Sequence, residues 1–179
     1  MQWLKRFTWK FWLTALGEIL FVATIFMALS YWQESDMLTA DSNVPVLTAV
    51  ALDGKQYRFP DQQQAAEHTL IYFFAPWCKI CHLSIGNLNI LRNQINEQRL
   101  KIMIVALDWK NKAEIEDYMT EHDLDFPVLL GDQSWHDQYK IIGFPSYYIV
   151  DKNGTVLSKS MGYSSSVGMI ARVLAFTDG

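Results

Sequence analysis

The sequence predicts an α/β domain with a mixed central sheet flanked by helices, preceded by a single transmembrane helix. The continuous apolar runs at residues 69–75 (TLIYFFA) and 100–107 (LKIMIVAL) are typical of strands buried on both faces. Segments with helical spacing follow each run, and strands that alternate with helices indicate an α/β sheet. The turn sequence at residues 151–154 (DKNG) predicts a late hairpin, which adds antiparallel strands. The transmembrane helix is predicted from the apolar stretch at residues 11–32.

The length and composition of the chain set broad limits on its function. The 179 residues suffice for one domain of ordinary size plus an appendage, and 50% of them are hydrophobic, which supports a real core. The formal net charge of −4 is weakly acidic and gives no electrostatic reason to expect nucleic acid. We therefore expect no nucleic-acid partner, and we also expect no cofactor.

The amino terminus predicts a membrane anchor and its orientation. Residues 11–32 contain Glu18 as their one charged residue, and about 20 apolar residues span a bilayer core. Lys5, Arg6 and Lys10 precede this stretch, and such cations stay on the cytoplasmic side. We therefore expect a single-pass protein of the cell inner membrane, with its folded domain in the periplasm. The predicted division is residues 1–10 as a cytoplasmic tail, 11–32 as the transmembrane anchor, 33–45 as a polar linker and 46–179 as the domain.

Two other interpretations of residues 11–32 stay open. Ala28, Leu29 and Ser30 offer small residues for cleavage of a signal peptide, although the apolar run exceeds the usual about 7–15 residues. A buried helix of a soluble domain is the third interpretation. A carboxylate such as Glu18 is costly in lipid, so it is expected either to hold a proton or to face a partner helix.

The first elements of the domain follow from short-range patterns. Residues 46–59 hold two strand-like runs around Asp53 and Gly54, which is a hairpin signal. After the strand at residues 69–75, the spacing of apolar residues predicts a helix within residues 82–98. The residues expected on its inward face are Leu83, Leu88, Leu91 and Ile95.

The second half of the domain continues the alternation of predicted strands and helices. Residues 112–124 predict an amphipathic helix with Ile115, Tyr118 and Met119 facing inward. Residues 126–131 (FPVLLG) predict a short strand or an extended connection. The remaining predicted elements are a strand at residues 141–150 entered through Pro145, its hairpin partner at 155–162, and a final helix at 164–176 with a serine available as its amino-terminal cap.

The two cysteines, Cys78 and Cys81, follow the first buried strand at a spacing that suits a reversible disulfide. Residues i and i+3 in the first turn of a helix lie about 5–6 Å apart, and a disulfide needs Cα atoms roughly 4.4–6.8 Å apart. Cys78 is expected at the helix start, where unpaired N–H groups, the helix dipole and nearby Lys79 all favour a thiolate. Cys81 lies one turn further in and is expected to be more buried. These positions predict that Cys78 attacks and that Cys81 resolves the mixed disulfide.

Two other roles for the cysteine pair compete with redox chemistry. A structural clip across so few residues closes a tiny loop and adds little stability. A zinc or copper site needs more ligands: His82 is adjacent, but there is no second cysteine pair, and His68, His122 and His136 show no ligand spacing. We therefore predict no metal site. A non-enzymatic metal-handling or assembly factor that uses the cysteines as ligands stays as an alternative.

Four segments together carry a resemblance to a known family. Trp77 to Cys81 (WCKIC) after an apolar strand resembles the active site of a thioredoxin-fold protein. Gly143 to Pro145 (GFP) before a strand resembles the cis-proline loop of that fold. Residues 149–162 (IVDKNGTVLSKSMG) and 51–59 (ALDGKQYRF) resemble the hairpins of the membrane-anchored TlpA/ResA-like branch. The resemblance covers roughly residues 46–176.

This resemblance implies a thioredoxin fold with a cis peptide bond before Pro145, in a loop that lies against Cys78. It implies that the backbone of Phe144 pairs with an extended substrate and that Trp77 is an exposed apolar contact beside the thiolate. Two positions depart from the family pattern. Tyr72 stands where thioredoxin has a buried aspartate, and Ser146 stands where branch members serving cytochrome c maturation tend to carry an acidic residue. The predicted catalytic residues are Cys78 and Cys81, and the predicted modulating or substrate-binding residues are Pro76, Trp77, Lys79, Ile80, Phe144 and Pro145.

The function implied by the resemblance is thiol–disulfide exchange with protein thiols, and the reducing direction is favoured because tethered TlpA-like domains are usually reductive. A reductase in an oxidising compartment needs an electron donor in the membrane, and an oxidant needs an acceptor. A thiol reductase for cytochrome c maturation is the alternative within the same family.

Overall fold

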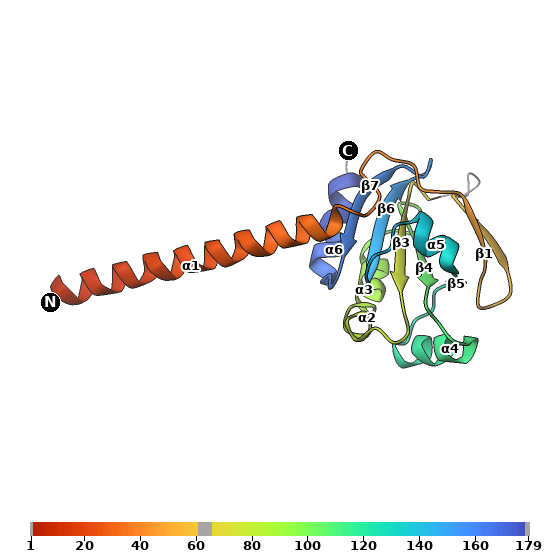
Figure 1. Ribbon diagram of the computed structural model, residues 1–179, viewed down its shortest axis with the longest axis horizontal. Coiled ribbons are helices and arrows are strands. Elements are labelled where there is room, and N and C mark those ends of the chain that lie inside the picture. The colour runs from red at the N-terminus through yellow and green to blue at the C-terminus, as the bar shows by residue number, and fades with distance from the viewer. Residues whose placement is uncertain (1, 61–65, 178–179) are drawn as a thin grey trace. The chain divides into compact units, whose positions relative to one another are not determined.

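The computed structural model describes residues 2–60 and 66–177. They fall into two compact units that divide between Ser35 and Asp36, and each is described by itself. The first unit is one continuous helix, α1 (Gln2–Glu34), drawn in red to orange in Figure 1. Its segment Phe11–Leu29 has a mean hydropathy of 2.0 and is long and apolar enough to cross a membrane, a test that signal sequences also pass.

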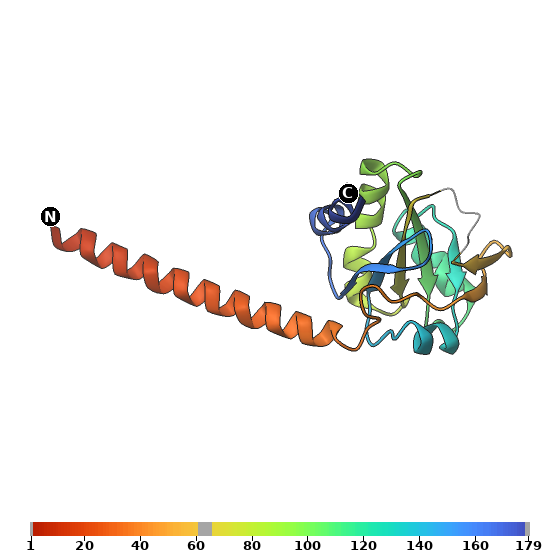
Figure 2. The same cartoon turned by 90° about the horizontal axis from the view of Figure 1, so that it is seen from above.

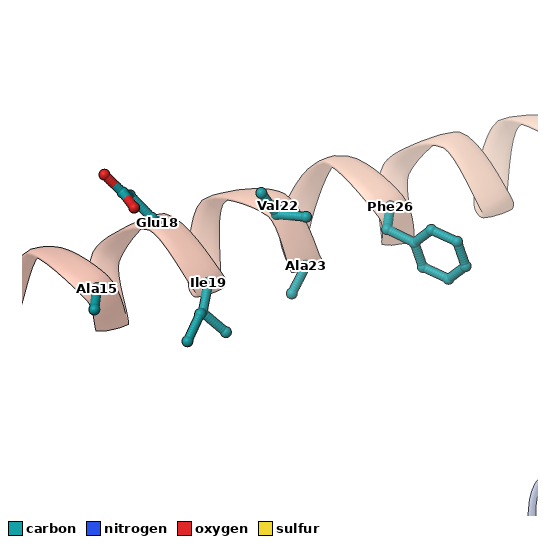
Figure 3. A pocket seen from close by; sticks show the side chains of 6 residues that line it. All are labelled: Ala15, Glu18, Ile19, Val22, Ala23 and Phe26. Atoms are coloured by element: carbon teal, nitrogen blue, oxygen red, sulfur yellow. The ribbon is translucent and has the colours of Figure 1, made fainter.

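The polar groups of α1 differ in how they are satisfied. The hydroxyls of Thr14 and Thr24 each donate to a backbone carbonyl of the preceding turn, Phe11 O at 2.9 Å and Leu20 O at 2.8 Å. Glu18 instead lines a shallow hollow of apolar residues, and Figure 3 shows its carboxylate projecting in a different direction from Ile19. A carboxylate in hydrocarbon is costly, and such residues usually face a partner helix or a water-filled cavity.

The second unit is built on a five-stranded sheet in the order β5-β4-β3-β6-β7. β3 pairs parallel with β4, and β4 pairs parallel with β5, whereas β6 and β7 add on the other side as antiparallel strands. The predicted mixed sheet is therefore confirmed. The strands are β3 (His68–Phe74), β4 (Leu100–Ala106), β5 (Val128–Leu130), β6 (Ser146–Asp151) and β7 (Val156–Met161).

Two hydrophobic cores cover the two faces of this sheet because side chains alternate along the strands. Leu70, Tyr72 and Phe74 of β3 pack with residues of α3, α4 and α6, whereas Ile71 and Phe73 pack on the opposite face with residues of α5 and the β1–β2 hairpin. Figure 2 shows α3 and α6 side by side. The helices are α2 (Lys79–Ser84), α3 (Asn87–Gln94), α4 (Lys112–Glu121), α5 (Gln133–Gln138) and α6 (Ser166–Thr177).

The predicted hairpin near the start of the domain forms a separate two-stranded sheet. β1 (Leu47–Val50) and β2 (Gln56–Phe59) pair antiparallel around a turn in which Gly54 has a φ of 85°. A bridge between Ala51 and Leu129 joins the hairpin to the edge of the main sheet. The hairpin therefore covers the free edge of β5.

The predicted linker, residues 33–45, differs from a free tether. α1 continues to Glu34, and Met37 and Val44 are buried in the domain. The backbone N–H of Val44 donates to Gly154 O at 2.8 Å, which ties this segment to the turn before β7. Composition suggested a tether because most of these residues are polar, but the few apolar ones anchor the segment to the domain.

The helix predicted within residues 82–98 is two helices, and one of its inward residues was predicted wrongly. α2 ends at Ser84 and α3 starts at Asn87, and the first turn of α2 already includes Cys81. Leu88, Leu91 and Ile95 are buried as predicted, whereas Leu83 is 73% exposed. The buried positions Cys81, Ile85 and Leu88 follow a spacing of four and then three residues, and Leu83 falls between them on the outer side.

Candidate active site

The strand and the helix that hold the two cysteines fix their geometry. β3 ends at Phe74, and a turn closed by a hydrogen bond from Cys78 N to Ala75 O, at 3.0 Å, leads into α2. Cys78 is the residue before the first turn of α2, and its Sγ accepts a hydrogen bond from the backbone N–H of Cys81 at 3.2 Å. This donor is placed to stabilise negative charge on the sulfur of Cys78.

The two thiols differ in exposure, and burial affects the pKa of the inner one. Cys78 is 7% exposed and Cys81 is fully buried, and both are free thiols. Burial first, and then the hydrogen bond with Cys78, raise the pKa of Cys81 well above its ordinary value. Cys81 therefore holds its proton at neutral pH, which agrees with its predicted role as the resolving cysteine.

Buried phenols surround the inner cysteine in place of a carboxylate. Tyr72 is fully buried, and its hydroxyl shares a hydrogen bond of 2.8 Å with the hydroxyl of Ser84. Tyr118 is also buried, and burial is the main cause that raises the pKa of both tyrosines, with charge on Cys81 as a further cause. No aspartate or glutamate is buried in the part of the chain that the structure describes. The buried environment of Cys81 thus contains hydroxyls but no carboxylate, as the departure at Tyr72 indicated.

The loop before β6 lies beside the cysteine turn. The peptide bond between Phe144 and Pro145 is cis, as the resemblance implied, and a second cis bond precedes Pro60. The ring of Phe144 meets the ring of Trp77 edge to face, with centroids 5.9 Å apart. Pro145 is buried, and its carbonyl accepts a hydrogen bond from Gly162 N at 2.8 Å. The fold therefore brings the cis-proline loop to Trp77, the residue before Cys78, although the two segments are remote in the sequence.

An exposed apolar collar, defined here as Trp77, Ile80 and Leu83, lies at intervals of three residues along the turn before α2 and α2 itself, on either side of Cys78 in the chain. These side chains are 58%, 46% and 73% exposed respectively. Of the other predicted site residues, Lys79 is exposed and Pro76 is buried. Large apolar side chains gathered at one exposed place mark a surface that contacts another molecule. Leu83 was not predicted as part of this surface, because the sequence pattern had assigned it to the core.

A histidine next to the cysteines makes contacts that the sequence did not reveal. The Nε2 atom of His82 lies 2.9 Å from the carbonyl oxygen of Pro76, and its Nδ1 atom lies 2.7 Å from Nε2 of His122. Burial, and then the neighbouring His82, lower the pKa of His122. His122 had been set aside because it shows no ligand spacing, and the contact depends on how α2 and the end of α4 pack together.

Comparisons with known proteins agree with this geometry. The model of the AhpC/TSA family matches residues 40–159. The thiol-disulfide oxidoreductase ResA of Bacillus cereus is 23% identical over 134 residues, which are 74% of this chain and 75% of that protein. The thioredoxin-like protein YneN of Bacillus subtilis is 23% identical over 122 residues, which are 66% of this chain and 69% of that protein.

Solved structures show the same fold. StoA from Bacillus subtilis superposes with a TM-score of 0.62 at 18% identity, covering 72% of this chain and 96% of StoA. A thiol:disulfide interchange protein of the thioredoxin family from Chlorobium tepidum superposes with a TM-score of 0.66 at 18% identity, covering 79% of this chain and 99% of that protein. The chain therefore belongs to the AhpC/TSA family, has the thioredoxin fold, and is similar to ResA-like thiol-disulfide oxidoreductases.

Proposed function

We propose that this protein is a membrane-tethered thiol-disulfide oxidoreductase that exchanges disulfides with protein thiols through Cys78 and Cys81. The observation that carries the proposal is the position of the Cys78 sulfur. It accepts a hydrogen bond from the N–H of Cys81 at the start of α2, and Trp77, the residue before Cys78, contacts Phe144 of the cis-proline loop. The names of relatives such as ResA support the same chemistry.

The reaction consists of two exchange steps. The Cys78 thiolate attacks one sulfur of a substrate disulfide, a Cys78–substrate disulfide forms, and the other substrate sulfur leaves as a thiolate that takes up a proton. Cys81 then loses its proton and attacks the Cys78 sulfur, which releases the second substrate thiol and leaves a Cys78–Cys81 disulfide. Two electrons thus pass from the protein to the substrate. The oxidising direction is the reverse of these steps.

The burial of Cys81 fits this order of events. The raised pKa of Cys81 keeps its thiol protonated until Cys78 has formed the mixed disulfide, so Cys78 attacks the substrate first. Trp77, Ile80 and Phe144 supply apolar contacts, and the backbone beside the cis-proline supplies hydrogen-bonding groups for an extended segment of a substrate protein.

We also propose that α1 anchors the protein in the inner membrane, with residues 1–10 in the cytoplasm and the domain in the periplasm. The apolar segment Phe11–Leu29 and the cations Lys5, Arg6 and Lys10 before it support this orientation. The proposed direction is reduction, by similarity to tethered TlpA-like domains. A reductase in an oxidising compartment needs electrons from a donor in the membrane.

Trapping of the reaction intermediate tests the proposed chemistry. The Cys81→Ser protein, purified in detergent and reduced, is mixed with oxidised insulin as a protein disulfide substrate. We expect a covalent insulin adduct that disappears on treatment with dithiothreitol, because Cys81 is absent and does not resolve it. The matched Cys78→Ser protein should form no such adduct. Equal adduct formation by both variants, or none by either, would contradict the assigned roles.

The membrane topology has a separate test. In intact cells, a maleimide that does not cross the inner membrane should label Cys78 of the reduced protein. The protein should stay in the membrane fraction after alkaline extraction. Labelling only after the inner membrane is opened would place the domain in the cytoplasm, and release by alkaline extraction would argue against an anchor.

A further inference from the structure

Three side chains outside the thiol chemistry converge beside the active site. His82 belongs to α2, whereas Glu121 and His122 lie at the end of α4, and their ligand atoms all lie within 4.8 Å of one another. We propose that His82, His122 and Glu121 form a binding site for a divalent first-row metal ion of the Zn²⁺ type. This inference goes beyond the proposed function, because the ligands are not the cysteines.

The orientation of His82 is the first argument for the site. The carbonyl oxygen of Pro76 only accepts hydrogen bonds, so the Nε2 atom 2.9 Å from it carries the proton. In the neutral ring the Nδ1 atom therefore carries an electron pair, which accepts the hydrogen bond from Nε2 of His122, and a carboxylate oxygen of Glu121 lies 3.8 Å away. A metal ion between the two nitrogens would replace the proton of this bond, while Nε2–H of His82 keeps its bond to Pro76. Histidines that bind metals almost always donate their other ring N–H to a carboxylate, a carbonyl or water in this way.

The distances are the second argument. Nδ1 of His82 lies 2.7 Å from Nε2 of His122 and 3.8 Å from a carboxylate oxygen of Glu121. Ligand atoms that bind a tetrahedral Zn²⁺ at about 2.1 Å lie about 3.4 Å apart. The two histidines therefore have to separate by less than about 1 Å. The carboxylate oxygen is near its required distance from His82 and lies within 4.8 Å of the His122 ligand atom. Side-chain rotation alone supplies movements of this size.

The surroundings of the histidines are the third argument. The ring of Tyr118 contacts both imidazoles, with centroid distances of 4.5 Å to His82 and 4.7 Å to His122. This buried ring limits the directions that the imidazoles take up. Glu121 is exposed, so an ion would reach the site from solvent and keep a position open for water. Two nitrogens and one oxygen suit Zn²⁺ and similar ions better than Ca²⁺ or Mg²⁺.

The site is linked to the active-site turn through a single contact. Pro76, whose carbonyl holds His82, directly precedes Trp77 and Cys78. An ion bound to Nδ1 makes the Nε2–H group a stronger donor, so binding is expected to strengthen the hydrogen bond to Pro76. A stronger hydrogen bond to Pro76 is expected to reduce the mobility of the turn that precedes Cys78.

The experiment removes the cysteines so that thiolates do not contribute to binding. The full-length protein with Cys78→Ser and Cys81→Ser, without a polyhistidine tag and in detergent, is titrated with Zn²⁺ by calorimetry. We expect one ion per chain. Co²⁺ as a second probe should give visible absorption bands without the charge-transfer band of a thiolate ligand. Metal binding by this protein does not depend on thiol exchange. A negative result would therefore contradict the metal site and leave the proposed function unaffected.

Variants identify the ligands. His122→Ala and Glu121→Gln, made in the cysteine-free protein, should each weaken Zn²⁺ binding at least about tenfold. The matched control is His136→Ala. His136 also lies 3.8 Å from a neighbouring carboxylate, that of Asp137, and its side chain is 31% exposed, against 32% for His82. This control should bind Zn²⁺ as tightly as the cysteine-free parent. Circular dichroism checks that each variant is folded, and Glu121→Gln alters an exposed side chain that the fold does not need.

Three results would overturn the inference. The first is no binding of Zn²⁺ or Co²⁺ to the cysteine-free protein. The second is binding that survives both His122→Ala and Glu121→Gln in folded protein. The third is binding that is lost in His136→Ala to the same extent.

Discussion

The backbone N–H of Cys81 donates a hydrogen bond to the sulfur of Cys78 at 3.2 Å, while the thiol of Cys81 is itself fully buried. The backbone of Cys81 is thus placed to stabilise negative charge on the sulfur of Cys78, while the sulfur of Cys81 has no contact with solvent. In the proposed exchange reaction this relationship assigns attack to Cys78 and resolution to Cys81. No charged side chain is buried among the residues that the structure describes.

The division of roles predicts the order of alkylation. In the reduced protein at neutral pH, iodoacetamide should modify Cys78 at least about tenfold faster than Cys81, because burial raises the pKa of Cys81 and keeps it as a thiol. Peptide mass spectrometry of samples quenched at successive times measures both rates. In urea the two rates should become similar. Faster modification of Cys81 in the folded protein would reverse the assigned roles.

The buried tyrosines predict a loss of stability at alkaline pH. Burial raises the pKa of four tyrosines above the ordinary value of 10.0, so the folded protein keeps protons that the unfolded chain releases. This contribution to stability is complete below pH 10 and is lost as the pH rises, by about 1.4 kcal/mol for each tyrosine and each pH unit. The four residues are Tyr72, Tyr118, Tyr139 and Tyr148.

Tyrosinate absorbance provides the measurement for this prediction. These four phenols should ionise together with cooperative unfolding, seen by near-ultraviolet circular dichroism, and not as independent groups. Gradual ionisation of all tyrosines near pH 10, with the tertiary signal retained, would show that the phenols are accessible to solvent.

The hydrogen bond between Tyr72 and Ser84 predicts a coupling that a double-mutant cycle detects. The two hydroxyls lie 2.8 Å apart, so Tyr72→Phe leaves the Ser84 hydroxyl without a partner, and Ser84→Ala leaves the Tyr72 hydroxyl without one. Each variant should lower the free energy of unfolding by about 1–3 kcal/mol. The double variant removes both groups and should cost less than the sum by about 1 kcal/mol. Chemical denaturation of the four proteins measures the cycle. Additive costs would mean that the two hydroxyls do not interact.

A comparison of Gly54 with Gly154, which have nearly equal φ, distinguishes the cost of backbone strain from the cost of a steric clash. Gly54 has a φ of 85° with open space around it, whereas at Gly154, with a φ of 84°, an added Cβ would lie 2.5 Å from Cγ of Pro60. Gly54→Ala should cost about 1–2 kcal/mol, the penalty of the left-handed conformation. Gly154→Ala should cost at least about 1 kcal/mol more, because a rigid proline ring has to move. Equal costs in chemical denaturation would mean that the turn before β7 adjusts freely.

Periodicity predicted the parts of the fold that have a strong hydrophobic pattern. β3 and β4 appear where the continuous apolar runs occur, and Ile115, Tyr118 and Met119 are the buried residues of α4. α5 was missed because its six residues are mostly polar around the single buried Trp135, which gives no period. Its one sequence signal is Asp132, whose carboxylate accepts from Ser134 N as a helix cap.

The part of the candidate site that is formed by neighbouring residues could be predicted from the sequence. The segment from Trp77 to Cys81 determines its own geometry, since the turn and the first helical turn follow from adjacent residues. The contacts of His82 with His122 were not predictable, because they join residues 40 positions apart through the packing of α2 on α4. The exposure of Leu83 was missed for a related reason: helix phase depends on where α2 begins, and the sequence pattern did not fix that point.

The most direct test of the account is the redox equilibrium of Cys78 and Cys81 in the full-length protein in detergent, measured against glutathione. A reductase of this kind should form a Cys78–Cys81 disulfide with a potential near that of thioredoxin, about −270 mV. A potential near about −120 mV would contradict the reducing direction and indicate an oxidant. Failure to form a disulfide between Cys78 and Cys81 at any ratio of oxidised to reduced glutathione would contradict thiol–disulfide exchange itself.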